Sequence, residues 1–263
     1  MGEALPLALV VGVATVLGLL LGSFLNVCIV RWGAEPKQSI FRPRRSHCPG
    51  CGAQIGARDN IPVVSWLLLG GRCRQCRWPI PARYPLVELA VGLLWGLAAW
   101  RWGASLEAAR AATFGTLLLG IAVTDARAYI IPDEFSLGGF ALGLGFAAAA
   151  GLPALLDALV GAAAGFAFLW LVAVVGTAVF RKDAMGGGDI KMMALVGAFT
   201  GWQGVLLTVF LGAFIGSVIF VPLRLLKGEV LVPFGIFLAI GAAAAFLVGP
   251  ALVQWYLVVS GLR

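Results

Sequence analysis

The sequence predicts an all-α, polytopic membrane helix bundle of about eight transmembrane segments, with one small loop domain. Of the 263 residues, 61% are hydrophobic and only 12% are charged, whereas a soluble domain carries about 25% charged residues. Apolar runs that approach the length of a membrane-spanning helix recur along the whole chain. The remaining positive charge is concentrated in residues 31–84.

The apolar runs are the predicted helices of the bundle. Most are shorter than the roughly 20 residues that a bilayer requires, so neighbouring residues must complete them. Small residues let helices approach closely in lipid, and residues 161–165 (GAAAG) are expected at such a contact. The run at 192–200 can be either a crossing or a short re-entrant piece. The eight runs are 7–30, 85–100, 108–124, 135–150, 155–180, 192–200, 205–221 and 232–248.

Charge gives the predicted orientation and domain organisation. Residues 31–84 contain ten Lys or Arg and only two acids, in a chain of net charge +7. Because cytoplasmic loops are rich in Lys and Arg, this stretch is the predicted cytoplasmic loop domain. It lies between a first transmembrane helix at 1–30 and a membrane-embedded domain at 85–263. The excess of Lys and Arg is thus explained by the orientation of the protein in the membrane, and we expect no nucleic-acid partner.

Four cysteines in the loop domain form two C-x-x-C pairs with 21 residues between them. Four thiolates at this spacing suit a tetrahedral zinc site in which the metal supplies folding energy. Because all four positions are filled by protein, the predicted zinc is structural. Two disulfides or four free thiols are the alternatives, and the cytoplasm disfavours disulfides. The four residues are Cys48, Cys51, Cys73 and Cys76.

Asp125 and Asp189 are the predicted catalytic residues. Each stands at the end of an apolar run, where a carboxylate is costly and seldom incidental. Eight crossings bring both residues to the cytoplasmic side, where a facing pair could supply the acid and the base that hydrolyse a peptide bond. The alternative is that Asp189 caps a helix while Asp125 pairs with Arg127 or Lys191.

The glycines before Asp189 are expected to position it. Gly186 and Gly188 permit backbone turns closed to other residues and leave room for a peptide to pass. Lys191 either tunes the acids or is an ordinary interfacial cation. Other hydrolytic chemistries are excluded, because His47 is the single histidine and the chain contains no H-E-x-x-H, Walker A or G-x-G-x-x-G motif.

These residues resemble the prepilin peptidases, the type IV leader peptidases, which are GxGD-type aspartic membrane proteases. The resemblance spans nearly the whole chain and includes both cysteine pairs. The other matching segments are residues 22–27 (GSFLNV), 60–67 (NIPVVSWL), 83–88 (RYPLVE), Asp125 with 131–133 (IPD), and 186–191 (GGGDIK).

The resemblance implies a bacterial inner-membrane enzyme. Members of the family cut the basic leader from type IV prepilins and type II secretion pseudopilins at the cytoplasmic face, with aspartates matching Asp125 and Asp189. Members with the cysteine loop typically also methylate the new N-terminus with S-adenosylmethionine. The residues that bind this cofactor are unknown, and Glu88 is one candidate, with an ordinary helix-start acid as the alternative.

Two functions from other classes stay open at this point. One is a non-catalytic membrane assembly factor whose zinc loop docks partners. The other is an ion-coupled transporter that uses the two acids. Both alternatives predict that the acids lie in mid-membrane or apart from each other.

Overall fold

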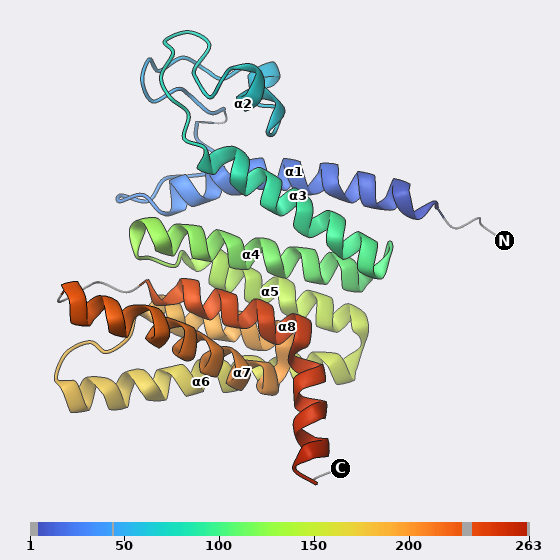
Figure 1. Ribbon diagram of the computed structural model, residues 1–263, viewed down its shortest axis with the longest axis vertical. Helices are drawn as coiled ribbons and strands as arrows, with labels where there is room; N and C mark the ends of the chain where they lie inside the picture. Colours follow the sequence, from blue (N-terminus) through green and yellow to red (C-terminus); the bar gives the residue numbers. More distant parts are fainter. Residues whose placement is uncertain (1–4, 44, 228–232, 262–263) are drawn as a thin grey trace. The chain divides into compact units, whose positions relative to one another are not determined.

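The computed structural model describes residues 5–43, 45–227 and 233–261. These residues form α-helices and one short 3-10 helix, with no strand beyond two isolated β-bridges. The chain divides into two compact units, residues 1–116 and 117–263. The predicted helical membrane protein is confirmed, and Figure 1 labels its elements.

The first unit is built on two long helices, α1 (Leu7–Trp32) and α3 (Arg83–Trp102). The two helices approach closely at glycines of α1, where a side chain would not fit. A Cβ atom added at Gly18 would lie 2.7 Å from the Val91 carbonyl oxygen, and a Cβ atom added at Gly22 would lie 2.7 Å from the Glu88 Cα. Asn26 also donates to the Tyr84 carbonyl oxygen at 2.9 Å. The loop domain lies between these helices in sequence and contains the 3-10 helix η1 (Ala57–Asp59) and α2 (Val64–Leu68).

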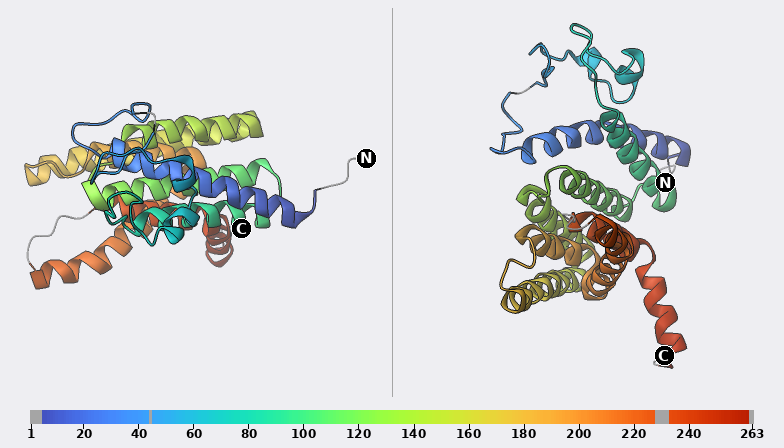
Figure 2. Two further views of the ribbon diagram at one scale, coloured as in Figure 1. Left: turned by 90° about the horizontal axis from the view of Figure 1, so that it is seen from above. Right: turned by 60° about the vertical axis from the view of Figure 1, so that its left-hand side comes forward.

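Helix α4 (Leu106–Ala128) begins in the first unit and ends in the second, which also contains α5 to α8. The right panel of Figure 2 shows the helices of the second unit side by side, seen nearly along their axes. Small residues lie at the contacts between these helices. Gly161 and Gly165 of α6 pack directly against the backbone of α7, as expected for the GAAAG motif. The helices are α5 (Asp133–Ala150), α6 (Leu152–Phe180), α7 (Gly187–Lys227) and α8 (Phe234–Val259).

Helix α7 is a hairpin of two helical arms. Gly201 has φ 67° and ψ 179°, which breaks the helix. Met193 and Val205 both lie against Gly165, although twelve residues of a straight helix would separate them by about 18 Å. The predicted runs 192–200 and 205–221 are therefore the two arms. The first arm, residues 187–200, is about 21 Å long, which is short for a hydrocarbon core of about 30 Å.

Every predicted apolar run falls on a helix, except that residue 232 of the last run lies outside the described residues and Pro233 is the N-cap of α8. Five of the described helices, α1, α4, α6, α7 and α8, are long and apolar enough to cross a membrane. Helices α3 and α5 are shorter and begin with charged residues. The membrane bundle is therefore confirmed, while the number of crossings is only approximate.

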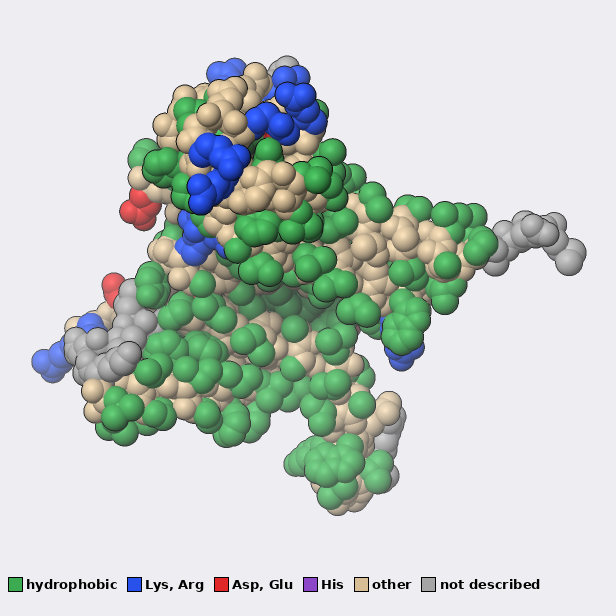
Figure 3. Space-filling view, turned by 45° about the horizontal axis from the view of Figure 1, so that its top comes forward, with side chains coloured by type: hydrophobic (Ala, Val, Ile, Leu, Met, Phe, Trp, Pro, Cys, Tyr) green, Lys and Arg blue, Asp and Glu red, His purple; other side chains and the backbone are tan. Residues whose placement is uncertain are grey.

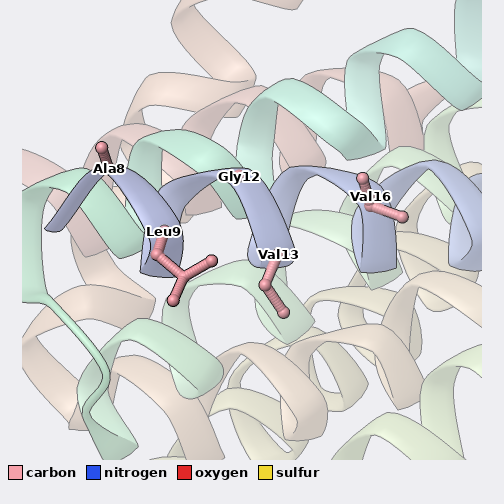
Figure 4. A pocket seen from close by; sticks show the side chains of 5 residues that line it. All are labelled: Ala8, Leu9, Gly12, Val13 and Val16. Carbon is pink, nitrogen blue, oxygen red and sulfur yellow. The ribbon is translucent and has the colours of Figure 1, made fainter. Parts of the chain in front are cut away.

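A shallow hollow on α1 is apolar throughout. Figure 4 shows its lining, which comes from one face of this single helix: Ala8, Leu9, Gly12, Val13 and Val16. None of these side chains can donate or accept a hydrogen bond. The hollow is therefore no candidate for chemistry, and we look for the site at the ends of the helices.

Candidate functional site

Asp125 lies in the last turn of α4 and is held by the start of α8. Its side chain is only 5% exposed. Its Oδ2 accepts a hydrogen bond from the backbone N–H of Ile236 at 3.2 Å. A Cβ on Gly235 would lie 2.9 Å from the same oxygen, so only glycine leaves room for the carboxylate there. Because the backbone amides at the start of a helix favour negative charge, the N-terminus of α8 stabilises the ionised carboxylate of Asp125.

Asp189 is the third residue of α7, and the positive end of that helix also favours its carboxylate. Its Oδ1 is buried and has no hydrogen-bond partner among the described residues. A buried carboxylate oxygen without a partner is costly and uncommon in proteins. The two aspartates are close enough for the charge of Asp125 to act on Asp189. The structure therefore brings together two acids that lie far apart in sequence.

Ile131 lies between the elements that carry the two acids. A Cβ atom added at Gly188, which precedes Asp189, would lie 2.9 Å from the Ile131 Cβ. A Cβ atom added at Gly235, which lies beside Asp125, would be 2.8 Å from the Ile131 Cδ1. One isoleucine thus contacts the starts of both α7 and α8. Pro132 follows it and is the N-cap of α5. Ile131 acts as a spacer between the two acid-bearing segments.

The glycines before Asp189 differ in what they require. A Cβ on Gly186 would lie 3.3 Å from Asp189 Oδ2 and one on Gly188 would press on Ile131, whereas one on Gly187 would meet nothing within 4 Å. None of the three has a positive φ. The expectation of turns closed to other residues is therefore wrong, and what Gly186 and Gly188 need is space.

Lys191 joins α7 to α5. Its Nζ donates to both carboxylate oxygens of Asp133, at 2.8 and 2.9 Å. The bond links the first residue of α5 to the fifth residue of α7, two residues after Asp189. Lys191 thus pairs with Asp133, whereas the alternative considered from sequence paired it with Asp125.

The four cysteines of the loop domain form a compact cluster. Their Sγ atoms all lie within 4.8 Å of one another, and those of Cys48 and Cys76 are 3.6 Å apart. Four sulfurs around one zinc at 2.3 Å would be about 3.8 Å apart, so the spacing fits a tetrahedral metal centre. No two of them form a disulfide. Of the alternatives considered from sequence, the structure therefore retains a metal site or free thiols.

Local hydrogen bonds prepare this cluster for a cation. The backbone N–H groups of Cys76 and Gln75 lower the pKa of the Cys73 thiol to about 7. The pKa of Cys76 is raised to about 12, because desolvation and the neighbouring thiols outweigh the lowering effect of the Trp78 amide. One thiolate forms readily and further ones repel each other. A divalent cation would remove that repulsion.

Comparison with known proteins gives the family. Residues 112–221 match the model of the type IV leader peptidase family, and residues 16–102 match that of the bacterial peptidase A24 N-terminal domain. The chain is 40% identical to a prepilin leader peptidase/N-methyltransferase of Stutzerimonas stutzeri, over 96% of this chain and 95% of that protein. It belongs to the type IV leader peptidase family.

Other members of the family also match over most of their length. A protein of the same name from Pseudomonas aeruginosa is 39% identical over 98% of this chain and 97% of its own length. One from Neisseria gonorrhoeae is 37% identical over 83% of this chain and 84% of its own length. No solved structure matches this chain.

Within this leader peptidase, Glu88 has a structural partner. Its Oε2 accepts a hydrogen bond from the backbone N–H of Val63 at 2.7 Å. Val63 has a φ of 61°, which is unusual for a β-branched residue. Glu88 therefore ties the loop domain to α3. Its binding to S-adenosylmethionine stays a prediction.

Three residues of the acid site were missed from sequence: Ile131, Gly235 and the amide donor Ile236. Two of them lie in or beside the apolar run of α8, where nothing in the pattern separates a site residue from a packing residue. The one available signal was a glycine directly after Pro233-Phe234 at the predicted start of a helix. Ile131 was noted only as part of the IPD segment.

Proposed function

We propose that this leader peptidase removes the leader peptide of type IV prepilins and pseudopilins as an aspartic endopeptidase, with Asp125 and Asp189 as its catalytic pair. The observation that carries the proposal is the buried, unpartnered Oδ1 of Asp189 within the electrostatic reach of Asp125. An oxygen so placed needs a hydrogen-bond partner from water or substrate. The relatives named above are prepilin leader peptidases, which supports the assignment.

The pair would work as acid and base. One ionised carboxylate takes a proton from a water molecule as that water attacks the peptide carbonyl. The other carboxyl, still protonated, gives its proton to the carbonyl oxygen or to the departing amine. Because coupled acids share their titration, the roles belong to the pair.

The site is placed at the cytoplasmic face of the bacterial inner membrane, together with the loop domain. The excess of Lys and Arg in residues 31–84 supports this orientation. A prepilin joins a basic leader to an apolar helix, so its scissile bond lies where the membrane meets the cytosol. Acids at the ends of helices match that depth, whereas acids of a mid-membrane transporter would not. An assembly factor would have no need for Asp189's unsatisfied oxygen.

The same protein also methylates the new N-terminus with S-adenosylmethionine as methyl donor. The full-length relatives carry N-methyltransferase in their names, which supports this second activity. Cys48, Cys51, Cys73 and Cys76 hold a structural Zn2+, which keeps the loop domain folded. The metal has no open position for substrate, so it takes no part in the transfer.

The test of the peptidase is cleavage of a purified prepilin by the detergent-solubilised wild type and by Asp125→Asn and Asp189→Asn. Each variant should lose at least about 100-fold in rate, because a general acid or base contributes about 10²–10⁴-fold. Asp183→Asn is the matched control, since Asp183 is an exposed acid shortly before Asp189. Near-normal cleavage by either active-site variant would remove that residue from the mechanism.

The methyltransferase is tested separately. A pre-cleaved pilin and labelled S-adenosylmethionine are incubated with wild type and with Asp189→Asn. Both should transfer label, because the acid pair is required only for cleavage. Absence of transfer with the wild type would refute this activity and leave the peptidase untouched.

A further inference from the structure

Helix α2 presents its apolar face outward. Val64, Leu67 and Leu68 follow a helical spacing within α2 and share one side, and Ile61 lies three residues before the helix. The exposed fractions of Ile61, Val64, Leu67 and Leu68 are 50%, 47%, 64% and 81%, respectively. Two further apolar side chains of the loop domain, Phe41 at 75% and Trp78 at 50%, are similarly exposed. We call Ile61, Val64, Leu67 and Leu68 the α2 patch.

The opposite face of α2 is fixed by hydrogen bonds. Ser65 Oγ accepts from the Ile61 N–H and donates to the Arg58 carbonyl oxygen, both at 2.9 Å. Trp66 Nε1 donates to the Ile80 carbonyl oxygen at 2.9 Å. The polar and aromatic side chains thus face into the loop domain. The outward direction of the α2 patch is a feature of the folded domain.

Glu88 fixes the depth of this segment relative to α3. Its bond to the Val63 N–H joins the residue before α2 to the second turn of α3. Glu88 is four residues, or about 6 Å, beyond Tyr84. Arg83 stacks on the Tyr84 ring at 5.2 Å, and the Tyr84 carbonyl oxygen accepts a hydrogen bond from Asn26, near the end of α1, which is long and apolar enough to cross a membrane. Aromatic and basic residues of this kind collect at the membrane interface. The α2 patch therefore begins near the level of that end of α1.

Charge around the segment matches an anionic lipid surface. Arg58 precedes it and Arg72 follows it, and both are exposed. Figure 3 shows Lys and Arg side chains gathered over the loop domain at the top of the view. Short apolar patches with flanking cations bind the interface of anionic membranes, with the apolar side chains below the headgroups.

We propose that the α2 patch inserts into the lipid interface and docks the loop domain on the membrane surface. The occupant is the headgroup and upper acyl region of the leaflet at the C-terminal end of α1. Hydrogen bonds hold α2 rigid, Glu88 sets its depth, and the neighbouring arginines bind lipid phosphates. Docking of this kind keeps the cysteine loop at the bilayer instead of leaving it free in solution.

The test is depth-dependent quenching in the full-length protein. A fluorescent amino acid replaces Leu68, or as matched control the exposed Gln54 of the same domain, and the protein is placed in nanodiscs of phosphatidylcholine and phosphatidylglycerol. Brominated lipid should quench the probe at position 68 at least about threefold more than the probe at position 54. Equal quenching at the two positions would overturn the proposal.

A second variant confirms that the patch itself is responsible. In the double variant Leu67→Glu/Leu68→Glu, a probe at Ile61 should lose its excess quenching by lipid, while bound metal shows that the domain is still folded. If the Leu68 probe is shielded from both brominated lipid and aqueous iodide, a protein surface covers the patch and the proposal is wrong. The cleavage assay is independent of both outcomes.

Discussion

The four cysteines and the two aspartates are assembled in opposite ways. The thiols come from one stretch of loop, residues 48–76, and local turns bring them together. The acids come from α4 and α7 and depend on the start of α8 and on the spacer Ile131. A site made by local turns is visible in residue spacing, whereas a site made by helix packing depends on residues that look ordinary in the sequence. The predictions below test this contrast, beginning with the largest effect.

Metal removal separates the two sites most strongly. Cys73→Ser should abolish metal binding and unfold the loop domain, since a structural zinc supplies about 10–16 kcal/mol of folding free energy. Methyl transfer should fall to background, while leader removal falls less because its acids lie in the other unit. Metal content and both activities are measured on one preparation.

The matched control is Cys28→Ser, which changes a buried cysteine outside the cluster. It should retain its metal. Full metal content in Cys73→Ser, or an equal loss of both activities, would contradict the separation.

Overfilling the acid site should affect only the peptidase. Gly235→Ala places a methyl group 2.9 Å from Asp125 Oδ2 and 2.8 Å from Ile131 Cδ1. Overpacking of this kind costs about 1–3 kcal/mol, and displacement of the acid should slow cleavage by about tenfold or more. Gly187→Ala meets open space and should behave as wild type. The idea fails if the two variants cleave prepilin equally well.

The ion pair between Lys191 and Asp133 should have a moderate effect. Both groups are partly exposed, at 38% and 51%, so the pair contributes about 0.2–1 kcal/mol to stability. Lys191→Met should lower kcat a few-fold by loosening the start of α7. The exchanged pair Asp133→Lys/Lys191→Asp should restore part of the rate, and absence of any rescue would assign Lys191 another role.

The smallest effect is expected at the pair that links η1 to the second cysteine turn. Arg74 donates to both oxygens of Asp59, at 2.7 to 3.0 Å, and these bonds lower the pKa of the Asp59 carboxyl. The pair therefore stabilises the loop domain at neutral pH, and its contribution is lost as the pH falls through the lowered pKa. Arg74→Ala should change methyl transfer about twofold or less.

Thermal unfolding scans at pH 7 in low and in high salt provide the measurement, because strong acid would also protonate the cysteines and release the metal. The difference between wild type and Arg74→Ala should be visible in low salt and shrink in high salt, which screens an exposed pair. A difference that grows with salt would contradict this assignment.

The sequence predicted the helices and the cysteine cluster because both depend on local features. Apolar runs identify helices in a membrane, and the C-x-x-C spacing places four sulfurs near one point. It also predicted that Asp125 and Asp189 would meet, because the expected crossings place both on one side. The break at Gly201 gives the runs 192–200 and 205–221 opposite directions, while the number of crossings stays a prediction.

The remaining features depend on contacts between distant segments. The role of Gly235 arises from the position of α8 against Asp125, and that of Ile131 from the meeting of three helix ends. The only partner that the sequence suggested for Lys191 was Asp125, and the packing of α5 against α7 selects Asp133 instead. The requirement for space at Gly186 and Gly188, in place of a positive φ, likewise became visible only with the neighbouring side chains in position.

The unpartnered oxygen of Asp189 has a consequence for thermal stability. A buried carboxyl that meets no protein donor stabilises the folded state less than a well-packed apolar side chain of similar size, so the wild-type protein is less heat-resistant than its fold permits. Active sites often carry such a cost. Asp189→Leu should therefore melt at a higher temperature than wild type while being inactive, and such a variant would be the better choice for trapping an uncut prepilin on the enzyme.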